Sequence, residues 1–231
     1  EERRQRFEQR QRAERRTFEE TRLWWVERLA ESPRPLEERM TLFWHGHFTS
    51  GFREVRQAVF MKEQNELLRR RALDNFGELG LAISRDRAML ASLDGNRNVA
   101  RQPNENYARE LLELFTLGVG NYTEGDIKAA ARAFTGWSFD DDGFTFRRAQ
   151  HDAGRKSFLG RSGNFGGDDV VRIIIDHPAC SRYLARKLLE YFVRPRPERA
   201  LVEALAREIR RHNYEMRPVM RALLSSQAFY D

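Results

Sequence analysis

Pro103-Asn104-Glu105-Asn106-Tyr107-Ala108-Arg109-Glu110-Leu111-Leu112-Glu113-Leu114-Phe115-Thr116-Leu117-Gly118 is the stretch of this chain that best indicates its fold. Proline followed by asparagine is typical of a helix start, and a glycine is typical of a helix end. At about 100° per residue, two apolar faces run along this stretch. One consists of Ala108, Leu111, Leu112 and Phe115, and the other of Tyr107, Leu114 and Leu117. We therefore predict a helix over residues 104–117 that is buried on two sides.

Apolar residues at helical spacing continue on both sides of this stretch. They predict further helices over residues 3–30, 36–44, 52–73, 85–93, 123–136, 168–175, 179–193, 197–212 and 215–229. The pattern is interrupted at residues 137–160, where apolar residues alternate around the acidic turn 140–143 and predict a short β-hairpin near 138–147. We predict a mainly α protein, a single multi-helix domain, with a charged N-terminal helix in residues 1–35 and a helical core domain in residues 36–231.

The composition of the chain excludes several classes of protein. Its 231 residues are 40% hydrophobic and 33% charged and include 16 Phe. This composition is too apolar for a disordered chain, and it is too charged for a bundle of membrane helices. No run of about 18 uncharged apolar residues is present, so we expect no membrane-spanning helix. Cys180 is the only cysteine, which excludes an internal disulfide framework.

The formal charge of +6 does not by itself indicate a nucleic-acid partner. Residues 1–22 carry eight Arg against six Glu, with the two signs interleaved at helical spacing. Interleaved charges are typical of a solvated helix with supporting ion pairs, whereas a phosphate-binding arm carries mostly one sign. The sequence therefore favours a solvated helix over nucleic-acid binding.

Two of the five histidines lie in the string Trp44-His45-Gly46-His47-Phe48. Side chains at i and i+2 diverge by about 200° on a helix, but they can converge on one ion where a helix ends, as a glycine between them allows. His45 and His47 are therefore candidate metal ligands. The alternative is that each imidazole caps a helix or bonds inside the core.

Glu110 lies within the second apolar face of the predicted helix 104–117, while Arg109 and Glu105 lie on or beside its polar strip. A carboxylate in apolar surroundings needs a cation, a hydrogen-bond donor or a proton. Glu110 is therefore either part of a structural salt bridge, or a metal ligand or acid–base group. His151 and Asp152, which follow the predicted hairpin, can likewise ligate a metal, or simply orient an imidazole and cap a turn.

The same strings, together with Ala131-Arg132-Ala133-Phe134-Thr135-Gly136-Trp137 and His151-Asp152-Ala153-Gly154-Arg155-Lys156, resemble the bacterial family catalogued as domain of unknown function 1800. Its members usually have Asn where this chain has Gly46. The resemblance implies an α-helical, extracytoplasmic (periplasmic or secreted) protein, and a chain that is part of a longer one. It also suggests a protein partner, because genes of this family often lie beside those of a second family that looks like sulfatases. The resemblance brings no established activity.

Two hypotheses of function follow. The first is a hydrolase or oxidoreductase whose helical scaffold gathers a divalent metal ion at one polar pocket, with the candidate ligands His45, His47, Glu105, Glu110 and His151. In it Asp152 orients His151, and Arg109 holds a substrate anion or Glu113, so that the candidate catalytic residues are Glu110, His151, Asp152 and Arg109. The second is a non-enzymatic structural or assembly module, in which the same residues form a buried ion and hydrogen-bond network.

Overall fold

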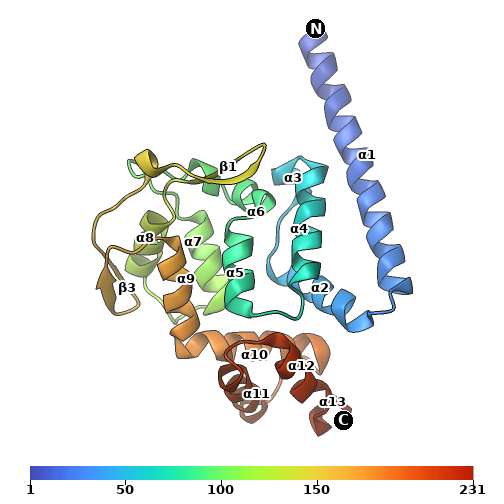
Figure 1. The fold of residues 1–231 in the computed structure, drawn as a ribbon, viewed down its shortest axis with the longest axis vertical. Helices are drawn as coiled ribbons and strands as arrows, with labels where there is room; N and C mark the ends of the chain where they lie inside the picture. The colour runs from blue at the N-terminus through green and yellow to red at the C-terminus, as the bar shows by residue number, and fades with distance from the viewer. Residues whose placement is uncertain (231) are drawn as a thin grey trace.

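The long helix α1 (Glu2–Glu31) opens the computed structural model, which describes residues 1–230. It runs beside α4 and projects past α3 at its N-terminal end (Figure 1). None of its residues is fully buried, and ion pairs at helical spacing such as Arg4–Glu8 and Arg6–Glu2 line its surface. The sequence before Pro33 thus forms the solvated helix that its interleaved charges indicate.

The rest of the chain forms a helical body around one large hydrophobic core. Its N-terminal part contains α2 (Pro35–His47), α3 (Phe52–Val55), α4 (Ala58–Arg70), α5 (Phe76–Ser84), α6 (Arg87–Ser92) and the 3₁₀ turn η1 (Gly95–Arg97). The aromatic rings of Trp44, Phe48, Phe76 and Phe115 are almost completely buried and contact one another in this core. The fold class predicted from the sequence, mainly α in a single multi-helix domain, is confirmed.

The middle of the chain contains α7 (Asn106–Glu110), which continues directly into the π-helix η2 (Leu111–Thr116), and α8 (Glu124–Ala133). The predicted helix over 104–117 therefore exists, but its second half is wider than an α-helix. Helix α8 begins with a reciprocal capping box, in which Thr123 Oγ1 accepts from the Asp126 amide and Asp126 Oδ2 accepts from the Thr123 amide.

In the region between α2 and η1, one prediction was wrong and one helix was missed. The helix expected over 52–73 is broken after α3, because Arg56 adopts a left-handed backbone conformation with φ of 58°. The helix α5 was not predicted. Its N-cap is Asn75, whose side chain accepts hydrogen bonds from the amides of Gly77 and Glu78.

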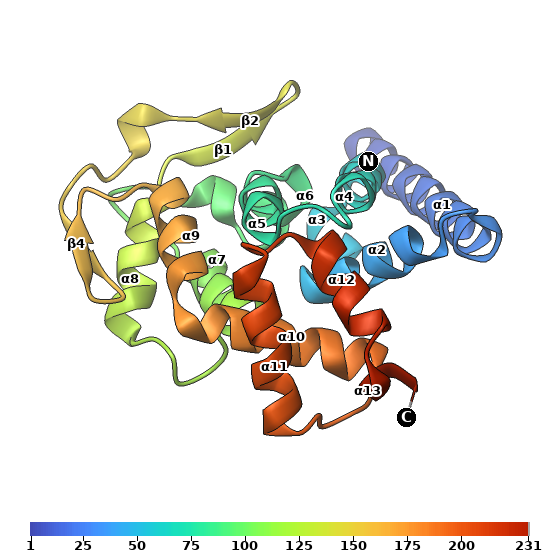
Figure 2. The same cartoon turned by 60° about the horizontal axis from the view of Figure 1, so that its bottom comes forward.

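The predicted hairpin is confirmed, and a second hairpin follows it. Strands β1 (Trp137–Asp140) and β2 (Gly143–Phe146) pair antiparallel, with Phe139 opposite Phe144. After the 3₁₀ turn η3 (Arg148–Gln150), β3 (Lys156–Phe158) pairs with β4 (Arg161–Gly163). In Figure 2 the β3–β4 hairpin lies across the body from α1, whereas the β1–β2 hairpin extends along the body towards α4, where Phe139 contacts Phe60.

The C-terminal part consists of α9 (Gly167–Asp176), α10 (Pro178–Phe192), α11 (Arg199–Arg211), α12 (Met216–Leu224) and α13 (Gln227–Tyr230). His177 caps α10 by accepting a hydrogen bond from the Ala179 amide, and Cys180 is a buried free thiol. Helix α10 passes beneath the core and contacts η2, so it helps to enclose the site described next. Among residues 1–230, no helix has both the length and the apolar character that crossing a membrane requires.

Candidate functional site

The π-helix η2 is the structural feature around which the candidate site is built. Both the Leu117 and the Gly118 amides donate to the Leu112 carbonyl, at 2.9 and 3.1 Å, where the helix ends. The carbonyls of Leu114 and Phe115 instead accept from side chains, as Tyr183 Oη lies 2.6 Å from the first and His47 Nε2 lies 2.8 Å from the second. π-helical turns are rare and are frequent at functional sites, so the cavity beside η2 is a candidate site.

This cavity, of about 360 Å³, lies between α2, η2 and α10. It is lined by Leu42, Phe43, Gly46, His47, Thr49, Leu114, Tyr183, Lys187, Glu190 and Tyr191. A Cβ atom added to Gly46 would meet no atom within 4 Å, so the missing side chain at this position leaves the cavity open. The cavity therefore combines aromatic walls with one amine and one carboxylate.

His47 forms part of the cavity wall and is almost fully buried. Burial lowers the pKa of His47, the hydrogen bond to Phe115 opposes this effect, and the positive charge of nearby Lys187 adds to it, so that the resulting pKa is about 4. Because Nε2 donates to the Phe115 carbonyl, the neutral ring carries its proton on Nε2 and leaves Nδ1 unprotonated. His47 thus ties α2 to the end of η2 as a neutral imidazole.

His45 lies on another side of α2. Its ring contacts Trp25 of α1, with 4.8 Å between ring centroids, and burial lowers its pKa. Helix α2 extends through His47, so the two histidines diverge as side chains at i and i+2 of a helix do. The structure does not bring this pair together, although Gly46 made a helix end between them plausible.

Arg109 and Glu105 are joined in a surface ion-pair cluster. The Arg109 guanidinium donates to both carboxylate oxygens of Glu124 at 2.9 Å and to Glu105 at 3.2 Å. The sequence hypothesis had Arg109 hold a substrate anion or Glu113. In the structure Glu113 does not bond to Arg109, and it accepts from the Tyr122 hydroxyl at 2.8 Å. Arg109 therefore links α7 to the start of α8.

Glu110 is half-buried. Burial raises its pKa, and the negative charge of Glu113 raises it further. Among residues 1–230 its carboxylate forms neither a hydrogen bond nor an ion pair with another side chain. The salt bridge that the apolar surroundings of Glu110 suggested is therefore not found in this part of the chain.

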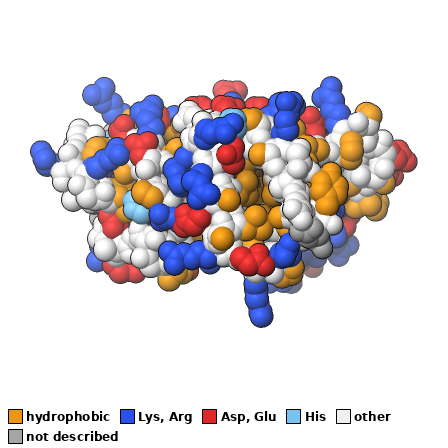
Figure 3. Space-filling model, turned by 90° about the horizontal axis from the view of Figure 1, so that it is seen from below, with side chains coloured by type: hydrophobic (Ala, Val, Ile, Leu, Met, Phe, Trp, Pro, Cys, Tyr) orange, Lys and Arg blue, Asp and Glu red, His pale blue; other side chains and the backbone are white. Residues whose placement is uncertain are grey.

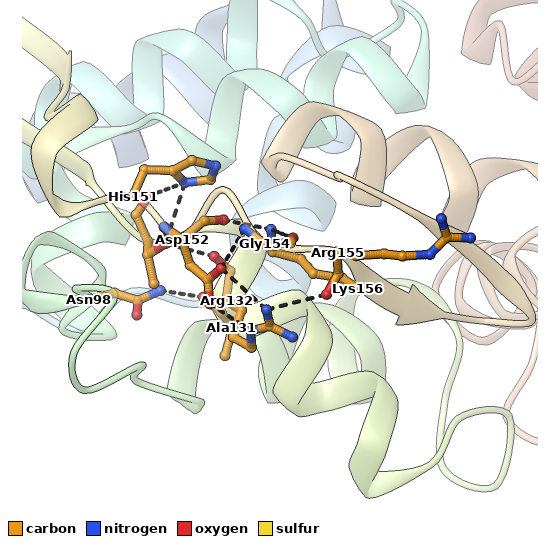
Figure 4. Close-up of polar contacts among 9 residues, drawn as sticks. Asn98, Ala131, Arg132, His151, Asp152, Gly154, Arg155 and Lys156 are labelled. Carbon is orange, nitrogen blue, oxygen red and sulfur yellow. Dashed lines mark hydrogen bonds and ion pairs between the residues drawn. The ribbon is translucent and has the colours of Figure 1, made fainter.

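His151 and Asp152 belong to a polar cluster between α8 and β3 (Figure 4). His151 Nδ1 donates to the Thr135 carbonyl at 2.9 Å. The Asp152 carboxylate is instead held by Arg132, with Nε to Oδ2 at 2.6 Å and Nη2 to Oδ1 at 3.2 Å, and by the Gly154 amide at 2.8 Å. The prediction that Asp152 orients His151 is therefore wrong, because a backbone carbonyl does so. The Arg132 hydrogen bond, which outweighs the effect of burial, lowers the pKa of Asp152 to about 2.

The centre of this cluster is Lys156, which the sequence reasoning missed. Its side chain is 2% exposed, and its ammonium donates to the carbonyls of Asp152 at 2.6 Å and Gly154 at 3.0 Å. Burial lowers the pKa of Lys156, and the charge of Asp152 opposes this effect. The residues before Lys156 do not indicate that it is buried. Its acceptors are backbone carbonyls of Asp152 and Gly154, and every residue has a backbone carbonyl.

A second ion cluster missed from the sequence joins the first helices. Glu38 of α2, 1% exposed, accepts from Arg69 of α4 at 2.8 Å and from Arg28 of α1 at 2.6 Å. Burial acts to raise the pKa of Glu38, but the hydrogen bonds and charges of Arg69 and Arg28 outweigh it and lower the pKa. The buried, paired carboxylate expected at Glu110 is thus found at Glu38.

The predicted site residues do not all meet at one pocket. His45 contacts α1, His47 contacts η2, Glu105 contacts Arg109, and His151 contacts Thr135. Within residues 1–230, no group of three or more His, Cys, Asp or Glu side chains is arranged to hold a metal ion.

The sequence of the whole chain was compared with those of known protein families. The family described as "Protein of unknown function (DUF1800)" matches residues 2–231. The chain belongs to the DUF1800 family. No curated protein and no solved structure matches this DUF1800 chain. The family assignment covers α1 as well as the core, so the solvated helix is part of the shared DUF1800 sequence.

Proposed function

We propose that this DUF1800 chain is a non-enzymatic structural or assembly module, whose His, Asp, Glu and Arg residues form internal ion and hydrogen-bond networks. One observation carries the proposal. Lys156, buried among the residues of the His151–Lys156 string, donates to two backbone carbonyls of that string, while Arg132 and the Gly154 amide occupy the Asp152 carboxylate. Side chains that are already paired in this way shape a loop and are not available to a substrate.

Other charged and polar residues of the core support the same interpretation. The Glu38, Arg69 and Arg28 cluster joins three helices, and His47 joins α2 to η2. The contacts of Glu38 with Arg69 and of His47 with Phe115 connect elements that are far apart in the sequence. Networks of this kind fix how helices are placed relative to one another, which a module that presents a surface to a partner requires.

The experiment compares the double variant H45Q/H47Q with the wild type and with H212Q. His212 is a matched control because it pairs with Glu208 at the end of α11, away from the cavity. Metal content is measured by elemental analysis, and the melting temperature is measured with and without Zn, Mn, Fe, Cu or Ca. We expect no stoichiometric metal in any of the three proteins, and a lower melting temperature for H45Q/H47Q alone.

The hypothesis of a divalent-metal-dependent hydrolase or oxidoreductase predicts the opposite result. It requires stoichiometric metal in the wild type and in H212Q, and its loss from H45Q/H47Q while the circular dichroism spectrum is unchanged. That result would overturn our proposal. It would also return Glu110, His151, Asp152 and Arg109 to consideration as catalytic residues.

A further inference from the structure

A groove lies between the N-terminal half of α1 and the short helix α3. It has a volume of about 810 Å³ and is lined by Phe7, Glu8, Gln11, Arg12, Arg15, Phe18, Glu19, Phe52, Arg53 and Arg56. At one end Phe18 stacks on Phe52, with ring centroids 4.2 Å apart and planes 5° apart. At the other end lies Phe7, which is 57% exposed. The groove is therefore apolar along its floor and open towards solvent.

The charges around this floor are unbalanced. Glu8 and Glu19 line the groove, but they are paired with Arg4 at 3.0 Å and Arg22 at 2.8 Å on α1 itself. The four arginines of the groove, Arg12, Arg15, Arg53 and Arg56, have no carboxylate within 4 Å among residues 1–230. On the face shown in Figure 3, by contrast, basic and acidic side chains lie among one another. The groove is thus a place where positive charge is not neutralised within the described chain.

The backbone at one wall of the groove is also unusual. Arg56 ends α3 in the left-handed region, with φ of 58°, which few residues other than glycine adopt. Its Nε donates to the Arg53 carbonyl at 3.1 Å, which fixes the Arg56 side chain at the end of α3. Arg53 and Arg56 both line the groove, so positive charge is concentrated at this wall.

We propose that this groove docks an acidic peptide segment of a partner protein, with an apolar side chain on the phenylalanine floor and carboxylates against the four arginines. The inference rests on the proposed role as an assembly module. Phe7 and Phe18 are eleven residues apart on one helix, or about 16 Å at 1.5 Å per residue, so a helical segment of about eleven residues matches the groove. Complementary charges on the peptide and the groove make the binding specific and increase the association rate.

A peptide fits the groove better than a nucleic acid does. Every nucleotide of a nucleic-acid strand carries a phosphate, at a rise of about 3.4 Å per nucleotide along the axis of duplex DNA, so some phosphates would meet the carboxylates of Glu8 and Glu19, which also line the groove. A peptide can place its acidic residues opposite the arginines and neutral or basic residues opposite Glu8 and Glu19. The mixed lining therefore favours a polymer whose charges are spaced by its sequence.

The test is fluorescence anisotropy with a labelled 14-residue helical peptide of Glu and Leu, at 50 and 300 mM NaCl. The R12E/R15E variant is compared with R3E/R10E, which makes the same charge change on α1 outside the groove. We expect R12E/R15E to weaken binding more than tenfold and R3E/R10E to weaken it less than threefold. F7S, which changes no charge, is expected to weaken binding three- to tenfold.

Circular dichroism and melting curves verify that all variants fold. No binding by the wild type, or equal losses in the two arginine pairs, would overturn the docking proposal, since equal losses show a response to net charge only. Tighter binding of a 20-base-pair DNA with the same dependence on Arg12 and Arg15 would assign the groove to nucleic acid instead. Each of these failures leaves the metal content and stability of H45Q/H47Q unaffected, so it is separate from a failure of the proposed function.

Discussion

The Nε2 atom of His47 donates a 2.8 Å hydrogen bond to the Phe115 carbonyl, and this bond connects the end of α2 to the π-helix η2. The carbonyl is available because the wider turn of η2 moves its backbone donors elsewhere, with two amides sharing the Leu112 carbonyl. The irregular helix and the buried imidazole therefore depend on each other. Removing either leaves a buried polar group without a partner.

This dependence predicts how stability changes with pH. The pKa of His47 is about 4 in the folded chain, against about 6.5 when unfolded, so between these values the unfolded state binds more protons. The stabilising contribution of neutral His47 is full above pH 6.5 and is lost as pH falls towards 4, by up to roughly 3 kcal/mol. In H47Q the amide can still donate to Phe115 but does not titrate. We expect urea unfolding to show a flatter pH dependence for H47Q than for the wild type between pH 4 and 6.5. The same slope in H47Q as in the wild type would contradict the prediction.

We predict that Asp86 changes the stability of the folded chain with pH in the opposite direction to His47. It caps α6 through the Met89 amide and accepts from Gln64 at 2.6 Å, and burial raises its pKa to about 6. Between pH 3.8 and 6 the folded state therefore binds more protons, so stability falls as pH rises through this window. Because asparagine is as good an N-cap as aspartate, D86N should keep the cap and lose the desolvated charge.

We expect D86N to be more stable than the wild type at pH 7.5 by about 1 kcal/mol, and to lose this advantage at pH 4. Urea unfolding at the two pH values measures both differences. A D86N protein that is less stable at pH 7.5 would show that the ionised carboxylate is favourable in the folded chain. Because Asp86 and His47 titrate in overlapping ranges with opposite signs, each variant is compared with the wild type at the same pH.

Local sequence patterns predicted the features that local interactions decide. The helix that begins at Thr123 and the hairpin near 138–147 were both predicted, because each depends on residues within a few positions of one another. The break at Arg56 was not predicted, since arginine in a left-handed conformation has no sequence signature. In the same way, widening of the 104–117 helix into a π-helix depends on His47 and Tyr183, which lie far away in the chain.

In the candidate site, too, local sequence patterns did not predict the contacts that depend on tertiary structure. Helical periodicity placed Glu110 in an apolar sector, yet the deeply buried carboxylate is Glu38, because α1 and α4 close over α2 at that point. Periodicity gives the face on which a side chain lies but not which neighbouring helix covers it. The partner of Asp152 was likewise set by the approach of α8 to β3, which no adjacent residue encodes.

The Glu38 cluster provides a prediction about coupling between residues. R69M leaves the 1% exposed Glu38 carboxylate without its buried partner, which typically costs about 3 kcal/mol of unfolding free energy. R28M removes a partner whose side chain is 42% exposed, so we expect a loss below about 1 kcal/mol. In an E38Q background, R69M should cost much less than in the wild type, because no buried charge is then left unpaired. Equal costs of R69M in the two backgrounds, measured by urea unfolding, would show that Arg69 acts through packing alone.

The Lys156 cluster offers the most direct test of whether the His151–Lys156 string is structural. K156M keeps the length of the buried side chain but leaves the Asp152 and Gly154 carbonyls without their donor, which we expect to cost about 1–3 kcal/mol. The exposed Lys128 on α8 gives a matched control, since K128M makes the same chemical change in solvent and should be near neutral. Hydrogen exchange should show faster exchange of the Gly154 amide in K156M, because the turn held by the ammonium opens more easily. If K156M and K128M melt alike and the Gly154 amide stays protected, the turn is held by Arg132 and Asp152 without Lys156, and the buried amine then has no structural task to explain its position.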